Sequence, residues 1–236
     1  MHSAVVESGV LRIRKNDTSK WYENIGFNIG EESVTVYLPA QGYDSLSITI
    51  QTGDVTIAKG FEFSNIQIKG STADIDCSAY TVGKTEIRVS TGDILLREIH
   101  TGELMLQAST GKIEVTTAQI DGELQCKTST GRITLTDVTC GDTDLTTDTG
   151  RVTTSHFSSN GDLRIKTDTG DVRFDASDAK TIFVKTDTGD VEGTLSTSKI
   201  FFTQTSTGKI SIPKSSTGGT CEITTGTGDI KIGIGN

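Results

Sequence analysis

The chain has 236 residues, of which 33% are hydrophobic, and a formal net charge of −9 at pH 7. This acidic balance argues against a nucleic-acid partner, since such proteins need a basic stripe that neutralises phosphates, and against binding to an anionic membrane surface. No apolar run reaches the roughly 18 residues that a membrane-spanning helix needs, so we expect no direct membrane insertion.

Residues 1–45 contain no repeat and are expected to form an N-terminal β cap within the same domain. Residues 10–13 and 34–38 alternate between apolar and polar side chains, which predicts strands. Trp21, Tyr22 and Phe27 lie between them. Because solenoids need capped ends and large aromatic side chains mostly contribute burial, we predict that this segment covers the first coil; an aromatic ligand site is the alternative. The first residues carry no basic and apolar signal segment.

From residue 46 to residue 236 a Thr-Gly corner returns every 19 or 20 residues. A fixed period in this range is typical of a solenoid. Nine of the ten central residues are glycine and the other is alanine. The ten are Gly53, Ala73, Gly92, Gly111, Gly131, Gly150, Gly170, Gly189, Gly208 and Gly228.

Each repeat encodes two strands. Apolar residues alternate with polar ones after each corner, as at Ile113 and Val115, and again before it, as at Leu104 and Leu106. A period of two indicates a strand with one buried face. Equivalent strands should stack about 4.8 Å apart as parallel sheets. We therefore predict an all-β, single-domain parallel β-helix of about ten coils, without helices and of right hand, which is the preferred hand of parallel crossovers.

The glycine of each corner stands where the apolar alternation changes phase, so it should take the positive φ that a residue without Cβ adopts easily. The Thr three residues before each glycine and the Thr one before it are expected inside the corner, and the charged residue after it outside. The cysteines are expected to be free, buried thiols, because three of them occupy apolar strand positions and the fourth lies near a second corner. They are Cys77, Cys126, Cys221 and Cys140.

The last repeat strand, residues 228–234, is followed by no cap. An open parallel edge invites pairing with another strand. We expect either that more chain follows or that another subunit covers this edge, which predicts a homo-oligomer formed through the C-terminal coil.

Carboxylates gather at two neighbouring corners. Such groups repel each other unless something neutralises them, and Ca²⁺ accepts oxygen ligands of this kind. The alternative is a solvated corner balanced by Arg151, Lys166 and Lys185. No other metal or cofactor is expected. The predicted calcium ligands are Asp168, Asp171, Asp187 and Asp190.

No catalytic constellation accompanies the repeat. His2, His100 and His156 lie at unrelated positions, and no Ser/His/Asp or Cys/His set stands out. Enzymes with a β-helix fold that cleave acidic polysaccharides build a groove from long loops, whereas the corners here are short and uniform. The sequence therefore predicts a protein that is not an enzyme.

Residues 34–39, 43–46 and 51–55, together with the later Thr-Gly-Asp turns, resemble the bacterial putative-adhesin domains of unknown function. The resemblance covers nearly the whole chain. It implies a β-helix located outside the cytoplasm or in envelope-stress proteins, with a binding or structural role and no established reaction. Its partner would be an unknown protein or glycan. The alternatives are a carbohydrate-active β-helix and a scaffold that only oligomerises.

Overall fold

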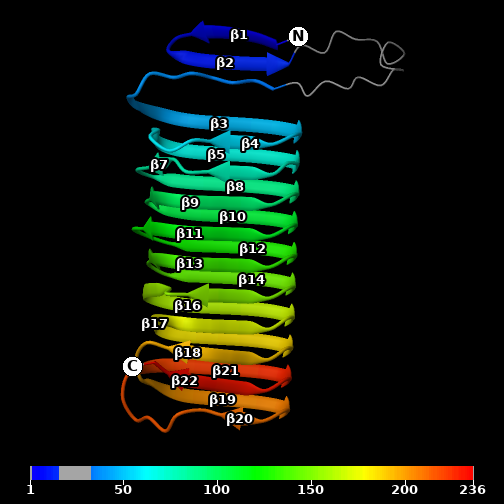
Figure 1. Ribbon diagram of the computed structural model, residues 1–236, viewed down its shortest axis with the longest axis vertical. Coiled ribbons are helices and arrows are strands. Elements are labelled where there is room, and N and C mark those ends of the chain that lie inside the picture. Colours follow the sequence, from blue (N-terminus) through cyan, green and yellow to red (C-terminus); the bar gives the residue numbers. More distant parts are fainter. Residues whose placement is uncertain (1, 16–32, 236) are drawn as a thin grey trace, which may run out of the picture. The chain divides into compact units, whose positions relative to one another are not determined.

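A computed structural model describes residues 2–15 and 33–235 (Figure 1). The chain separates into two compact units, residues 1–39 and residues 40–236. The first strand of the second unit begins at Gly42, so the coils start a few residues before the predicted boundary. The cap function of the N-terminal segment stays a prediction.

The first unit contains an antiparallel hairpin of β1 (His2–Glu7) and β2 (Val10–Lys15). Ser8 and Gly9 form its turn with positive φ angles of 50° and 78°. The strand predicted at residues 10–13 is confirmed. The strand predicted at 34–38 is wrong, because residues 33–39 have no regular structure. The aromatic residues at 21, 22 and 27 lie outside the described residues.

The second unit is a β-solenoid whose strands all pair in parallel within one continuous sheet. No residue in the described ranges is helical. The strands are β3 (Gly42–Thr52), β4 (Val55–Ile57), β5 (Glu62–Thr72), β6 (Ile75–Cys77), β7 (Tyr80–Thr81), β8 (Lys84–Thr91), β9 (Ile94–Thr101), β10 (Glu103–Thr110), β11 (Ile113–Ile120), β12 (Leu124–Thr130), β13 (Ile133–Cys140), β14 (Thr143–Thr149), β15 (Val152–Ser155), β16 (Ser158–Thr169), β17 (Val172–Thr188), β18 (Val191–Leu195), β19 (Lys199–Thr207), β20 (Ile210–Ser211), β21 (Gly219–Thr227) and β22 (Ile230–Ile234).

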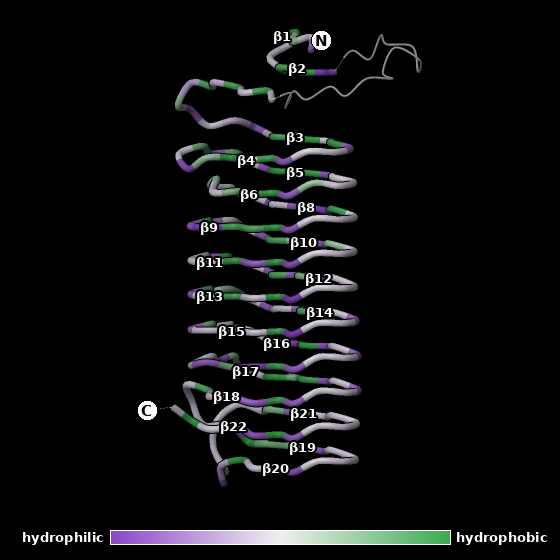
Figure 2. The backbone as a smooth tube through the Cα atoms, turned by 45° about the vertical axis from the view of Figure 1, so that its right-hand side comes forward, coloured by the Kyte–Doolittle hydropathy of each residue, from purple (hydrophilic) through white to green (hydrophobic). Residues whose placement is uncertain are grey.

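Equivalent residues of successive coils lie beside one another and bury the same positions. In the ladder of strands that precede the corners, Leu106 of β10 lies between Ile87 of β8 and Cys126 of β12. In the ladder that follows the corners, Ile113 of β11 lies beside Ile133 of β13. These side chains are fully buried, and the apolar segments recur at the same place in each coil (Figure 2). The predicted stacked coils are confirmed, while the hand stays a prediction.

The corner glycines lie close to both neighbouring coils. Gly111 has a φ of 141°, and its N–H donates to the Thr130 carbonyl at 3.0 Å. Thr128 is buried and donates its hydroxyl to the Gly111 carbonyl at 3.1 Å, so the Thr three residues before the glycine lies inside, as predicted. The Thr directly before the glycine is exposed, for example Thr149 beside the exposed Asp148. That part of the prediction is wrong, because the alternation of buried and exposed side chains ends at the buried Thr three residues before the glycine.

The aspartate after the corner glycine has a structural role. Asp74 accepts the Asp93 backbone N–H at 2.7 Å, and Asp93 accepts that of Lys112 at 2.9 Å. Each such carboxylate accepts a backbone N–H of the next corner. That N–H lies between two strands and takes no part in the regular hydrogen bonds of the sheet. The acidic ladder therefore connects coils, which explains why it recurs with the repeat.

The last two coils do not follow chain order. β21 pairs with β17 on one side and with β19 on the other, and β22 lies in the same way between β18 and β20. The C-terminal coil is thus inserted between the two coils that precede it, as the red strands show in Figure 1. The predicted open edge at residues 228–234 is wrong, since the end coil is β19–β20. The return step from β20 to β21 runs against all other steps, so this crossover has the opposite hand to the rest.

A buried ion pair spans the inserted coil. Lys199 of β19 has a side chain only 4% exposed, and its Nζ lies 2.5 Å from Oδ1 of Asp178 in β17. Gly219 of β21 lies between Lys180 and Lys199, and the Lys199 stem crosses it. Because Gly219 has no side chain, the ammonium group reaches past the inserted strand. In the interleaved order this contact joins β17 and β19, which are not adjacent in the stack.

Candidate functional site

A column of residues in the left-handed conformation bends the segment that follows the corner in successive coils. Each has a φ between 44° and 55° although none is glycine. A left-handed conformation costs such residues about 1 kcal/mol each. Sequence analysis missed this bend, because the side chains in the column share no residue type. They are Glu98, Thr117, Asp137, His156 and Ala176.

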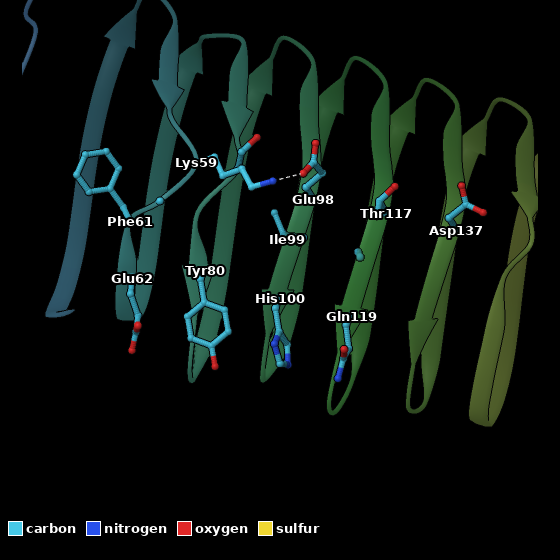
Figure 3. Close-up of a pocket in the computed structure, with 13 residues that line it drawn as sticks. Lys59, Phe61, Glu62, Tyr80, Glu98, Ile99, His100, Thr117, Gln119 and Asp137 are labelled. Atoms are coloured by element: carbon cyan, nitrogen blue, oxygen red, sulfur yellow. Dashed lines mark hydrogen bonds and ion pairs between the residues drawn. The ribbon is translucent and has the colours of Figure 1, made fainter. Parts of the chain in front are cut away.

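A shallow groove runs along this bend over the first coils of the solenoid, with a cavity volume of about 600 Å³. The sequence suggested no room for a groove between short corners, yet the bend and the strand-to-strand turns hollow the surface without long loops. Figure 3 shows two rows of side chains, one from each side of the bend. The chemically distinctive lining residues are Lys59, Phe61, Glu62, Tyr80, Glu98, His100, Gln119 and Asp137.

The groove side chains are held by contacts between coils. Lys59 donates to the Glu98 carboxylate, which lowers the pKa of Glu98. The His100 ring lies edge-on to the Tyr80 ring with 5.0 Å between centroids. Nε2 of His100 lies 3.1 Å from both carboxylate oxygens of Asp121, and this contact lowers the pKa of Asp121. The aromatic and imidazole rings are therefore fixed in orientation, and both carboxyl groups are ionised at neutral pH.

The chemistry of the groove is acidic and partly aromatic. Three carboxylates line it against one lysine, which is already paired. Tyr80 is 38% exposed, so part of its ring is accessible. A neutral or amino-bearing ligand with apolar ring faces suits this lining, and an anionic ligand does not.

The four aspartates of the predicted calcium site lie at the corners of β16–β18. Asp171 accepts Nη2 of Arg151 at 2.8 Å and the Asp190 backbone N–H at 3.1 Å, and the arginine contact is the main cause of its lowered pKa. Asp190 in turn accepts the backbone N–H of Asp229 at 2.8 Å. Asp168 lies 3.8 Å from Nζ of Lys166. Asp187 is exposed.

Within residues 2–15 and 33–235, no three acidic, histidine or cysteine side chains form a group that could hold a metal ion. Calcium binding stays a prediction with a simple test. The calcium hypothesis expects that millimolar Ca²⁺ raises the melting temperature relative to chelator, and that Asp187→Asn removes this rise. Equal melting temperatures in Ca²⁺ and chelator would contradict it. Lys185→Gln, on the same exposed strand surface, is the control for a general charge effect.

The four cysteines are free and buried, as predicted. Burial raises the pKa of Cys140 to about 11 and that of Cys221 to about 12. A thiolate is the form that attacks electrophiles and binds metals. These thiols therefore act as small apolar side chains of the core.

A protein-family model covers the chain in two matches, residues 2–125 and 121–236, described as Toastrack DUF4097. The chain belongs to this family. The two Toastrack matches overlap at residues 121–125, which comprise the turn after β11 and the first two residues of β12. The Toastrack domain has no established function, and the stacked coils agree with its fold. Comparisons with curated proteins and with solved structures gave no match. The described residues include no helix long and apolar enough to cross a membrane.

Proposed function

We propose that this Toastrack chain is a non-enzymatic, adhesin-like binding module outside the cytoplasm, and that the groove along the bend binds a neutral or amino-bearing glycan. The observation that carries this proposal is the groove itself, with its exposed Tyr80 ring and the carboxyl side chains that line it. Aromatic rings offer apolar area to sugar faces, and oriented polar groups accept hydrogen bonds from sugar hydroxyls. The resemblance to adhesin domains supports the location.

A binding role is favoured over hydrolysis by the state of the carboxyl groups. A glycosidase needs one carboxyl that remains protonated to donate a proton to the leaving group. Glu98 is paired with Lys59, and this contact lowers its pKa. Asp137 lies 3.5 Å from Nδ1 of His156 and is half exposed. The Lys59 contact therefore favours an ionised Glu98 that accepts hydrogen bonds.

Replacing Tyr80 by alanine is expected to weaken glycan binding at least about tenfold, because a central aromatic contact usually contributes more than 1 kcal/mol. The wild type is first screened on an array of neutral, amino-bearing and acidic glycans. The dissociation constant of the best glycan is then measured by calorimetry for both proteins.

Tyr37→Ala is the matched control, because Tyr37 is 91% exposed and belongs to the first unit rather than to the groove. It should bind like the wild type. Equal affinity for Tyr80→Ala and the wild type, or binding to acidic glycans alone, would contradict the proposal. Release of new reducing ends from the bound glycan would instead identify a carbohydrate-active enzyme. A blank array combined with self-association would identify a pure scaffold.

A further inference from the structure

The interleaved order leaves the coil β19–β20 at the end of the solenoid, with one edge of both strands unpaired. Its inward side chains are incompletely covered: Phe201 and Ile212 are partly buried and Ile210 is 45% exposed. Their counterparts Cys221 and Ile230 in the adjacent inserted coil are fully buried. The end coil therefore presents an apolar layer and two strand edges that another coil could cover.

The first coil, β3–β4, has the same features at the other end of the second unit. Leu46, Ile48 and Ile50 are only partly buried. Their counterparts Ile66 and Ile68 in β5 are fully buried. Both end coils therefore have inward apolar side chains that are only partly buried, and both have the geometry of the other coils.

The charges of the two end coils are opposite. Between residues 199 and 218 every charged side chain is a lysine, although the chain as a whole has a net charge of −9. Lys199 is neutralised by Asp178, whereas Lys209 and Lys214 are exposed. Between residues 42 and 57 every charged side chain is an aspartate. Such an arrangement favours contact between the last coil of one copy and the first coil of another, and disfavours contact between two last coils.

The repeat register decides which side chains would meet. Continuing the stack places Thr207 beside Thr52 of a second copy, Ile210 beside Val55 and Lys209 beside Asp54. The same order of charges already occurs inside the chain, where Arg151 of one corner bonds Asp171 of the next at 2.8 Å. Lys209 and Asp54 are both exposed and occupy the positions of Arg151 and Asp171.

We propose that the chain associates head to tail, with the β19–β20 coil of one copy stacked on the β3–β4 coil of a second copy so that the sheet continues across the interface. A heterologous contact of this kind does not close on itself and yields linear assemblies. Such stacking requires an open first coil. It therefore excludes the predicted cap function of residues 1–45 in the assembled protein, and it is independent of the groove.

The test exchanges the charges of the expected pair. In sedimentation velocity over a concentration series, the wild type should form linear oligomers. Lys209→Asp and Asp54→Lys should each weaken association about tenfold, since each turns an attraction into a repulsion. Mixing the two variants should restore association, because the carboxylate introduced in the last coil of one variant then faces the ammonium group introduced in the first coil of the other. Because the last coil of the Asp54→Lys variant and the first coil of the Lys209→Asp variant keep the wild-type pair, the mixture should form linear oligomers in which the two variants alternate.

Lys127→Asp is the matched control, because it makes the same charge change on an exposed strand position in the middle of the solenoid. It should associate like the wild type. Circular dichroism verifies that each variant keeps its β structure. The proposal is overturned if the wild type stays monomeric at all concentrations, or if the mixture of the two variants associates no better than either variant alone.

Discussion

Replacing Gly111 by alanine is expected to destabilise the solenoid by about 4 kcal/mol or more, or to prevent folding. A Cβ at this position would lie 2.0 Å from the Gly92 carbonyl oxygen and 2.6 Å from its carbonyl carbon. Both atoms belong to the backbone of the neighbouring coil, so relief requires separation of two stacked strands. The φ of 141° adds strain for any residue with a side chain. Thermal and urea unfolding followed by circular dichroism measure the effect.

Gly60→Ala is the matched control. Gly60 also has a positive φ, 96°, but a Cβ there would meet no atom within 4 Å. Only the backbone strain remains, so the expected loss is about 1 kcal/mol. Equal losses for the two variants would show that the corner glycines serve backbone conformation alone. The natural Ala73 does not adopt a positive φ, so it avoids the backbone strain that both variants would introduce.

Replacing Asp178 by alanine is expected to destabilise the protein by about 3 kcal/mol, because it leaves the buried ammonium of Lys199 without its counter-charge. The Asp178 carboxylate also accepts the Ala179 N–H at 2.8 Å and the Thr197 hydroxyl at 2.7 Å. After its removal, Nζ of Lys199 keeps the hydroxyl of Thr197 at 2.8 Å. A neutral hydroxyl compensates little of the desolvation of a charge. The shift of the urea midpoint measures the loss.

Two further variants separate the ion pair from simple packing. Asp178→Asn combined with Lys199→Met removes both charges and keeps similar volumes, so it should lie within about 1 kcal/mol of the wild type. Asp76→Ala removes half of an exposed ion pair, in which Oδ2 of Asp76 lies 2.6 Å from Nη1 of Arg97, and should cost less than about 1 kcal/mol. If Asp178→Ala lowered the free energy of unfolding as little as Asp76→Ala does, the Asp178–Lys199 ion pair would not stabilise the inserted coil as proposed.

The sequence anticipated most of the solenoid because its repeat is local and regular. The alternation around Ile113 and Leu106 gives strand positions and the buried face, and the period gives the stacking register. The buried cysteines follow from their apolar positions. The strand predicted at 34–38 failed, because short apolar alternation is not enough when no partner strand is supplied.

The candidate groove could not be predicted in the same way. Tyr80 and His100 come together only because the coil brings residues about one repeat apart side by side, and their types differ from coil to coil. The left-handed bend at Glu98 and Asp137 has no common residue type. The predicted calcium ligands, by contrast, were found from a repeated pattern, and the structure places two of them, Asp171 and Asp190, in the ladder that connects coils.

By itself, the sequence determined that the chain forms stacked parallel coils with glycine corners, buried threonines and free thiols, because each of these depends on residues within one repeat. Only the tertiary structure decided the order of the last coils. All coils share one register, so the repeat pattern does not distinguish a stack in which β19 follows β17 from one in which β21 lies between them. In the observed order the Lys199 side chain reaches over Gly219 to Asp178, a contact between non-adjacent coils that the repeat pattern does not specify.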